Sequence, residues 1–149
     1  MDIVRPAANP RQSEMARIIA LCNQKGGVGK STSAQNLSVF LSALGQKVLL
    51  VDFDPQANTT SGMGLDPKRI EHSVYHALIG KIPTKDVIRR TSLLGVDLLP
   101  ATPALAGAGI ELVDIPRREY KLKEALDPIR RSYDFMIIDS APSLGLLTI

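Results

Sequence analysis

A chain of 149 residues, 44% of them hydrophobic, is long enough to bury one core and too short for two comfortable domains. Eighteen Lys and Arg against fifteen Asp and Glu leave a net charge of +3, from which neither nucleic-acid nor lipid binding can be predicted. The sequence has one cysteine, no Cys/His cluster and no run of eighteen apolar residues, which excludes an internal disulfide, a zinc site and a membrane span. We therefore expect one globular domain in the cytoplasm, without membrane contact.

The first half of the chain shows apolar runs alternating with helical periodicity, a pattern typical of a parallel sheet. Residues 1–16, with two prolines and charges of both signs, are predicted to form a flexible arm. Segment 17–23 predicts a buried strand that leads into a glycine-rich loop. A helix is expected from Lys30 to a stop at Gly45, and a second buried strand over 47–54.

The second half is predicted to continue this alternation. The expected elements are short helices after Ser73 and Thr84, a strand over 96–101, an Ala-rich helix over 102–113, an amphipathic helix bent near Pro128 and a strand over 133–139. The predicted fold class is therefore α/β, a mainly parallel sheet flanked by helices.

The glycine-rich loop at residues 25–32, "KGGVGKST", is typical of a phosphate-binding loop. Its glycines let backbone N–H groups surround an anion, and the positive end of the following helix dipole adds to the attraction. Lys30 would reach the β- and γ-phosphates, Ser31 would ligate Mg²⁺ and Thr32 would contact the α-phosphate. An ordinary glycine turn is the alternative. A dinucleotide-binding fold fits worse, because its motif needs glycine or alanine at Thr32.

Two of the predicted strands end in carboxylates. A nucleoside triphosphate site needs such groups there to bind a metal ion and to position a water molecule. Asp139, after four apolar residues, is the candidate Walker B aspartate; the alternative is a carboxylate that caps the next turn. Asp52 and Asp54 are expected to point the same way because strand side chains alternate. Asp54 is the better candidate to orient the attacking water. The alternative is two solvated loop carboxylates.

Three other features receive structural interpretations. His72 and His76 are expected to be a surface pair rather than a metal site, and Cys22 a small core residue. A basic series is expected to be a solvated face rather than a DNA surface. This series comprises Arg89, Arg90, Arg117, Arg118, Lys121, Lys123, Arg130 and Arg131.

The motifs together carry a family resemblance over residues 17–149. "NQKGGVGKST" resembles the deviant Walker A motif of the ParA/MinD group of P-loop ATPases, in which the early lysine, here Lys25, is the signature. "VDFDPQANTTSG", "LLPATPALAGAGIEL" and "IIDSAPSLGLLTI" resemble the ParA/Soj partition branch. Members of the family continue beyond the equivalent of Ile149. We therefore interpret residues 17–149 as the N-terminal part of a longer P-loop domain. This part ends after the Walker B strand, which would leave the strand over 17–23 at an unpaired sheet edge.

The resemblance implies ATP and Mg²⁺ as cofactors and an ATP-dependent homodimer in which Lys25 reaches the partner's phosphates. Implied nucleotide-binding residues are Gly26, Gly27, Val28, Gly29, Lys30, Ser31, Thr32 and Asn58. The implied metal residues are Ser31 and Asp139, and the implied catalytic residues are Lys25, Lys30 and Asp54.

The function implied is ATP hydrolysis in chromosome or plasmid partition, in the cytoplasm and on the nucleoid. A ParB-type centromere-binding protein would be the activating partner, and DNA would be bound without sequence preference through residues mainly beyond this chain. Two alternatives stay open: another ATPase of the group, acting in septum or pole positioning, and a non-catalytic truncated fragment.

Overall fold

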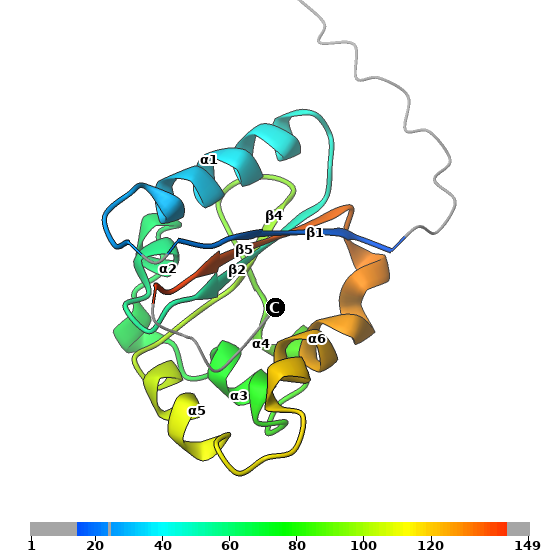
Figure 1. Ribbon diagram of the computed structural model, residues 1–149. Coiled ribbons are helices and arrows are strands. Elements are labelled where there is room, and N and C mark those ends of the chain that lie inside the picture. The colour runs from blue at the N-terminus through cyan, green and yellow to red at the C-terminus, as the bar shows by residue number, and fades with distance from the viewer. Residues whose placement is uncertain (1–14, 24, 143–149) are drawn as a thin grey trace, which may run out of the picture.

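The computed structural model describes residues 15–23 and 25–142, which form a sheet with helices on both faces (Figure 1). The strands are β1 (Arg17–Leu21), β2 (Val48–Phe53), β3 (Arg89–Arg90), β4 (Val96–Leu99) and β5 (Phe135–Ser140). Their order across the sheet is β1-β5-β2-β4-β3, and every pairing is parallel except that of β3 with β4. The predicted α/β class with a mainly parallel sheet is confirmed.

The helices connect the strands and cover the sheet. They are α1 (Lys30–Ala43), α2 (Asn58–Gly62), α3 (Val74–Leu78), α4 (Thr84–Val87), α5 (Leu105–Glu111) and α6 (Lys121–Leu126), with 3₁₀ turns η1 (Pro67–Arg69), η2 (Arg118–Tyr120) and η3 (Asp127–Ser132). Within the described part of the chain, no helix combines the length and the apolar character needed to cross a membrane.

Alternation along the central strands divides the buried side chains into two clusters. Val48 and Leu50 of β2 pack with α1, on one face of the sheet. Leu49 and Val51 pack on the opposite face, in the larger cluster that contains residues of α3, α5 and α6. Figure 1 shows α1 on one side of the sheet and these three helices on the other. Because both faces are covered, β2 is buried at every position.

Strand β1, which leads into the glycine loop, is at the predicted place in the sequence, but the prediction that it is buried is wrong. Among the described residues it pairs with β5 alone and lies at the edge of the sheet, as predicted. Ile18 and Ile19 are 36% and 38% exposed. Cys22, just after the strand, is exposed rather than in the core. An edge strand lacks a neighbour on one side, so side chains on both of its faces remain accessible to water.

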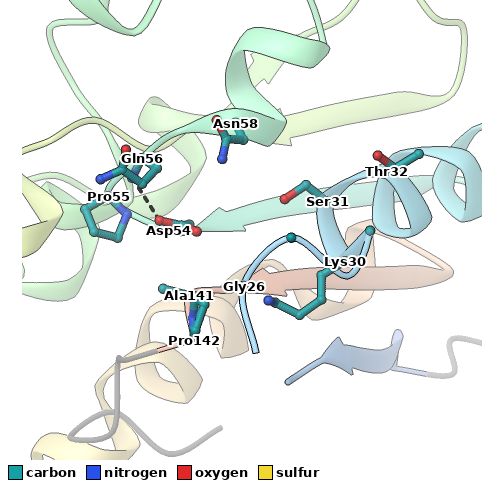
Figure 2. Close-up of a pocket in the computed structure, with 12 residues that line it drawn as sticks. Gly26, Lys30, Ser31, Thr32, Asp54, Pro55, Gln56, Asn58, Ala141 and Pro142 are labelled. Carbon is teal, nitrogen blue, oxygen red and sulfur yellow. Dashed lines mark hydrogen bonds between the residues drawn. The ribbon is translucent and has the colours of Figure 1, made fainter. Parts of the chain in front are cut away.

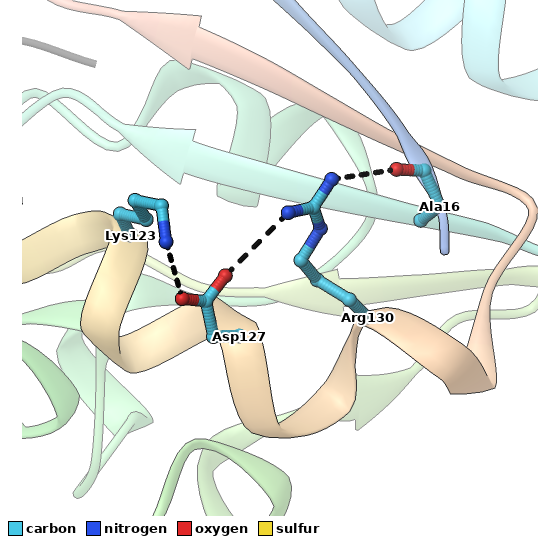
Figure 3. Close-up of polar contacts among 4 residues, drawn as sticks. All are labelled: Ala16, Lys123, Asp127 and Arg130. Atoms are coloured by element: carbon cyan, nitrogen blue, oxygen red, sulfur yellow. Dashed lines mark hydrogen bonds and ion pairs between the residues drawn. The ribbon is translucent and has the colours of Figure 1, made fainter. Parts of the chain in front are cut away.

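The start of β1 is attached to the last helical segment. The backbone N–H of Ala16 donates to the Arg130 carbonyl oxygen at 2.9 Å, and Arg130 Nη2 donates to the Ala16 oxygen at 3.3 Å. Asp127 lies 3.6 Å from the Arg130 guanidinium and 2.6 Å from Lys123 Nζ (Figure 3). These contacts fix one end of an edge strand that has only one strand partner.

The remaining differences from the predicted elements are local. Strand β2 ends at Phe53, one residue before Asp54, and helix α2 and the short strand β3 were not predicted. The bend predicted near Pro128 is a change from α6 to the 3₁₀ turn η3, because proline cannot donate the hydrogen bond that would continue an α-helix. The predicted arm falls almost entirely on residues 1–14, which lie outside the described residues, as do residues 143–149.

Candidate functional site

A cavity of about 600 Å³ opens at the carboxyl ends of the parallel strands (Figure 2). Its volume lies within the range of small-molecule sites, and its place is where parallel α/β sheets bind ligands. The residues that line it are Gly26, Gly27, Gly29, Lys30, Ser31, Thr32, Asp54, Pro55, Gln56, Asn58, Ala141 and Pro142. The cavity therefore collects most of the predicted site residues, from the two segments 26–32 and 54–58, and adds Ala141 and Pro142 from a third.

The glycine loop has the backbone and the open space that a phosphate needs. Gly27 and Gly29 have φ angles of 71° and 83°, in the left-handed region that other residues rarely adopt. A Cβ added at either of them, or at Gly26, would meet no other atom within 4 Å. Glycine is therefore not required here by crowding within the protein. The positive φ angles account for glycine at two of the positions, and the open space beside all three leaves room for a ligand to approach the backbone.

Lysine side chains flank this loop in different ways. Lys30, the first residue of α1, directs its Nζ to within 3.5 Å of the Lys25 carbonyl oxygen, across the loop. The Lys25 side chain is exposed, while its backbone N–H donates to Asn23 Oδ1 at 3.0 Å. Val28 is 45% exposed. Neither Lys25 nor Val28 lines the cavity.

Asp54 lies in the cavity wall, on the side away from the glycine loop (Figure 2). It is 9% exposed, and its Oδ1 accepts a hydrogen bond from the Gln56 N–H at 2.8 Å. The turn that follows places Ala57 at φ 54°, a left-handed conformation that is uncommon for alanine. Asn58, the next residue, begins α2 and also lines the cavity.

Asp52 does not point into the cavity beside Asp54, contrary to the prediction. Side-chain alternation holds only while the backbone is extended, and β2 ends between them at Phe53. Asp52 is fully buried and accepts hydrogen bonds from Thr60, through the backbone N–H at 2.7 Å and the hydroxyl at 2.6 Å. The alternative of two solvated loop carboxylates is also wrong, since both side chains are buried.

Asp139 is the last residue but one of β5 and lies beside Asp52, its partner in the strand register. It is 1% exposed and accepts a hydrogen bond from the Thr59 hydroxyl at 2.7 Å. Burial raises the pKa of Asp52 to about 7; the bonds from Thr60 oppose that rise, and the nearby charge of Asp139 adds to it. Asp139 is not among the residues that line the cavity, but Ala141, two positions later, is.

The sequence interpretation missed Thr59 and Thr60, which bond to the two buried carboxylates. Both follow Asn58 in the motif "VDFDPQANTTSG", from which only the aspartates and the asparagine were taken as candidates. Two hydroxyl residues directly after a predicted site residue were the available signal. No local pattern predicts that a helix of five residues forms there, because so short a helix depends on tertiary contacts.

The other sequence candidates have structural partners. The backbone N–H of Ser73 donates to His76 Nδ1 at 3.1 Å, in the capping box that begins α3. The rings of His72 and His76 contact edge to face, with centroids 5.5 Å apart. Within the basic series, Lys121 pairs with Glu124 at 2.9 Å.

The residues present fit a phosphorylated ligand with a divalent cation. Open loop amides, the Lys30 ammonium and the first turn of α1 suit a chain of phosphates. The hydroxyl of Ser31 and a carboxylate oxygen of Asp139 are hard oxygen donors of the kind that Mg²⁺ prefers. A ligand of this kind brings its own oxygen donors, so few protein ligands are needed.

Comparison with known proteins agrees with this geometry. The sequence model of a family described as an AAA domain matches residues 16–149. The chain belongs to this family, in the branch of the ParA/Soj-type ATPases. It is 50% identical to the sporulation initiation inhibitor protein Soj of Bacillus subtilis over 135 residues. These residues cover 91% of this chain and 53% of that protein.

Two further relatives connect the chain to partition and to nucleotide. The chromosome partitioning protein ParA of Myxococcus xanthus is 46% identical over 135 residues, which cover 91% of this chain and 48% of that one. A Mycobacterium smegmatis structure named cobyrinic acid a,c-diamide synthase, with bound ADP and magnesium, superposes with a TM-score of 0.86 at 42% identity, covering 89% of this chain and 54% of that chain. The chain thus spans about half the length of these relatives.

Proposed function

We propose that this chain binds ATP with Mg²⁺ and hydrolyses it, as the nucleotide-binding part of a chromosome or plasmid partition protein. One observation carries the proposal: a single cavity brings the open glycine loop, Lys30 and Ser31 together with Asp54 and Asn58. The name of the Myxococcus relative supports the partition role, and the ADP and magnesium of the Mycobacterium structure support the ligand.

Each residue has a role set by its position. The N–H groups of residues 26–32 and the ammonium of Lys30 hold the phosphates, with Thr32 at the α-phosphate. Ser31 and Asp139 would hold Mg²⁺, which when bound neutralises negative charge on the phosphates. Asp54, on the opposite wall, accepts a hydrogen bond from the attacking water and orients it, and Asn58 assists beside it.

Lys25 acts between two copies of the protein. Its side chain is exposed and does not line the cavity of its own chain. In an ATP-dependent homodimer, the Lys25 ammonium of each copy contacts the phosphates held by the other, where it stabilises the charge of the transition state. The dimer is the form that binds DNA without sequence preference, and a ParB-type protein stimulates hydrolysis. The site of action is the nucleoid in the cytoplasm.

A second candidate function is ATP-dependent amide synthesis, because the Mycobacterium structure carries a synthase name. The two candidates differ in the acceptor of the phosphoryl group, which is water in hydrolysis and a carboxylic acid in amide synthesis. Release of phosphate from ATP in the absence of any acceptor acid supports hydrolysis. Release that requires an acceptor carboxylic acid and an amide donor supports the synthase.

Nucleotide binding by the 149-residue chain is the first test. We expect a fluorescent ATP analogue to bind in the presence of Mg²⁺, and Lys30→Ala to weaken that binding by about a hundredfold, the loss of a charge-assisted contact of about 3 kcal/mol. Lys68→Ala is the matched control, because Lys68 is an exposed lysine in η1, outside the cavity. Equal binding by the two variants would overturn the proposed site.

Hydrolysis and pairing are tested separately. Asp54→Ala is expected to keep nucleotide affinity within about threefold while reducing phosphate release by about a hundredfold or more, because Asp54 acts on the water rather than on the phosphates. Lys25→Ala is expected to abolish the ATP-dependent dimer measured by sedimentation. A dimer that persists in this variant would exclude the role of Lys25 between copies.

A further inference from the structure

Thr59 makes a buried contact that the proposed function does not yet use. Its side chain is completely buried in α2, and its hydroxyl donates to Asp139 Oδ2 at 2.7 Å. The two residues lie 80 positions apart in the sequence, and Asp139 is itself 1% exposed. A short hydrogen bond between two buried side chains fixes the rotamers of both.

The position of Asp139 in the sheet means that the orientation of its side chain matters for the cavity. Asp139 lies in register with Leu21 of β1 on one side and with Asp52 of β2 on the other. Strand β1 continues into the glycine loop, and β2 continues into Asp54. Rotation of the Asp139 side chain would therefore change the direction of its oxygens relative to both walls of the cavity. The Thr59 hydroxyl bonds to Oδ2, so Oδ1 is the oxygen that would face a metal.

Thr60, the next residue, makes the corresponding contact with the other buried carboxylate. Its hydroxyl donates to Asp52 Oδ2 at 2.6 Å and accepts a hydrogen bond from the Ala101 N–H at 2.9 Å. Two adjacent threonines of one short helix thus attach to two adjacent strands. Asp52, unlike Asp139, is not assigned to the metal, and the Thr60 hydroxyl joins it to the backbone of Ala101, so this contact serves the attachment of α2 to the sheet.

Gln35 connects the same hydroxyl to the helix that begins at the glycine loop. Gln35 Nε2, in α1, lies 3.5 Å from Thr59 Oγ1. A Cβ added at Gly62, at the end of α2, would lie 2.5 Å from Gln35 Oε1. Close packing of α1 on α2 therefore places the Gln35 amide beside Thr59. Because the amide donates to the hydroxyl oxygen, it favours the orientation in which the hydroxyl hydrogen points to Asp139.

We propose that Thr59 is a positioning residue for the metal site: its hydroxyl orients the Asp139 carboxylate so that Oδ1 faces the coordination shell of the Mg²⁺ that accompanies the nucleotide. This inference rests on the proposed function. Partners of metal ligands act in this way, and their loss typically weakens metal affinity by about ten- to a hundredfold. Thr59 itself touches neither the nucleotide nor the metal.

A merely structural role for Thr59 makes a different prediction. If the hydroxyl only attached α2 to β5, its removal would lower the melting temperature without changing the Mg²⁺ dependence of nucleotide binding. If it orients Asp139, the Mg²⁺ dependence changes and the binding of nucleotide without metal does not. The concentration of Mg²⁺ at which nucleotide binding is half-maximal is therefore the quantity that separates the two roles.

The experiment titrates Mg²⁺ into the 149-residue chain with a fluorescent ATP analogue and measures the midpoint, with a parallel titration of nucleotide in EDTA. Thr59→Val removes the hydroxyl at nearly constant volume, and we expect it to raise the Mg²⁺ midpoint by about tenfold. Thr59→Ser keeps the hydroxyl and is expected to stay within about twofold of wild type. Thr60→Val is the matched control, expected to lower the melting temperature and leave the midpoint unchanged.

Each outcome decides the inference. A Thr59→Val midpoint equal to wild type overturns it, as does an equal rise in the Thr60→Val variant. If Thr59→Val does not fold, Thr59→Ala is measured in its place and the same two results apply. Absence of nucleotide binding by the wild-type chain at every Mg²⁺ concentration overturns the proposed function and the inference together, whereas binding with an unchanged variant midpoint overturns the inference alone.

Discussion

The two sides of the glycine loop are supported very differently. On one side, β5 and β2 each carry, one residue before their ends, a carboxylate that is buried and hydrogen-bonded to α2. On the other side, β1 lies at the edge of the sheet with exposed side chains, and Phe40 of α1 is 63% exposed. The binding geometry is therefore held mainly by the central strands and α2, while the strand that carries the loop contributes little to the core.

The largest difference between the two regions should appear on truncation of apolar side chains. Leu50→Ala removes a fully buried side chain of β2 and should lower the free energy of unfolding by about 2–5 kcal/mol. Ile19→Ala in β1 should lower it by about 1 kcal/mol or less, because the side chain is already partly in water. Urea denaturation measures both. Equal losses would show that β1 belongs to the core as fully as β2.

The buried carboxylate of Asp52 should make the free energy of unfolding depend on pH. The pKa of Asp52 is raised from 3.8 to about 7, so between these values the folded protein binds this proton more tightly than the unfolded chain. The contribution of Asp52 therefore falls as pH rises through that window, by at most on the order of 4 kcal/mol. Asp52→Asn removes the titration, so its stability relative to wild type should improve from pH 4.5 to 7.5. A constant difference in urea denaturation would contradict this.

Substitution of two glycines at opposite ends of α1 distinguishes an effect on backbone strain from an effect on ligand binding. Gly29 and Gly45 have φ angles of 83° and 81°, and an added Cβ meets no atom within 4 Å at either position. Alanine at either should therefore lower the free energy of unfolding by about 1 kcal/mol. Only Gly29→Ala should also weaken nucleotide binding, by about tenfold or more, because only that methyl group enters the cavity. Equal nucleotide affinities would show that the loop is not the binding surface.

The smallest effect should come from the ion pairs that hold the start of β1. Asp127→Ala removes the contacts to Lys123 and Arg130 and should lower the free energy of unfolding by about 0.5 kcal/mol, because these groups are partly exposed. The effect should shrink further in 1 M salt, where such charges are screened. A loss several times larger, measured by urea denaturation at both salt concentrations, would mean that the edge strand depends on this anchor far more than its exposure indicates.

The sequence predicts the part of the site that local patterns determine. The glycine loop, the beginning of α1 at Lys30 and the strand that carries Asp139 follow from residue spacing and hydrophobic runs; the loop and α1 begin where expected, and the strand predicted over 133–139 runs from Phe135 to Ser140. Gly45 likewise stands just after α1, with the left-handed backbone expected of a helix stop.

The parts that could not be predicted depend on contacts between distant segments. Helix α2 exists because Thr59 and Thr60 find buried carboxylates on β5 and β2, and no spacing rule in a five-residue segment contains that information. The separation of Asp52 from Asp54 depends on where β2 ends, which sequence reasoning places only to within a few residues. The exposure of Cys22 follows from the edge position of β1, a property of the sheet rather than of the strand.

Hydrogen exchange of the 149-residue chain, measured by mass spectrometry with and without ATP and Mg²⁺, tests the central claim most directly. That claim is that the glycine loop and the carboxylates of β2 and β5 form one site for a metal-bound polyphosphate. We predict slower exchange at residues 25–33, 54–62 and 139–142, with no change around the separate cavity beside Tyr133. Protection of residues 25–33 without any change at 54–62 and 139–142, or protection confined to the second cavity, would contradict the account.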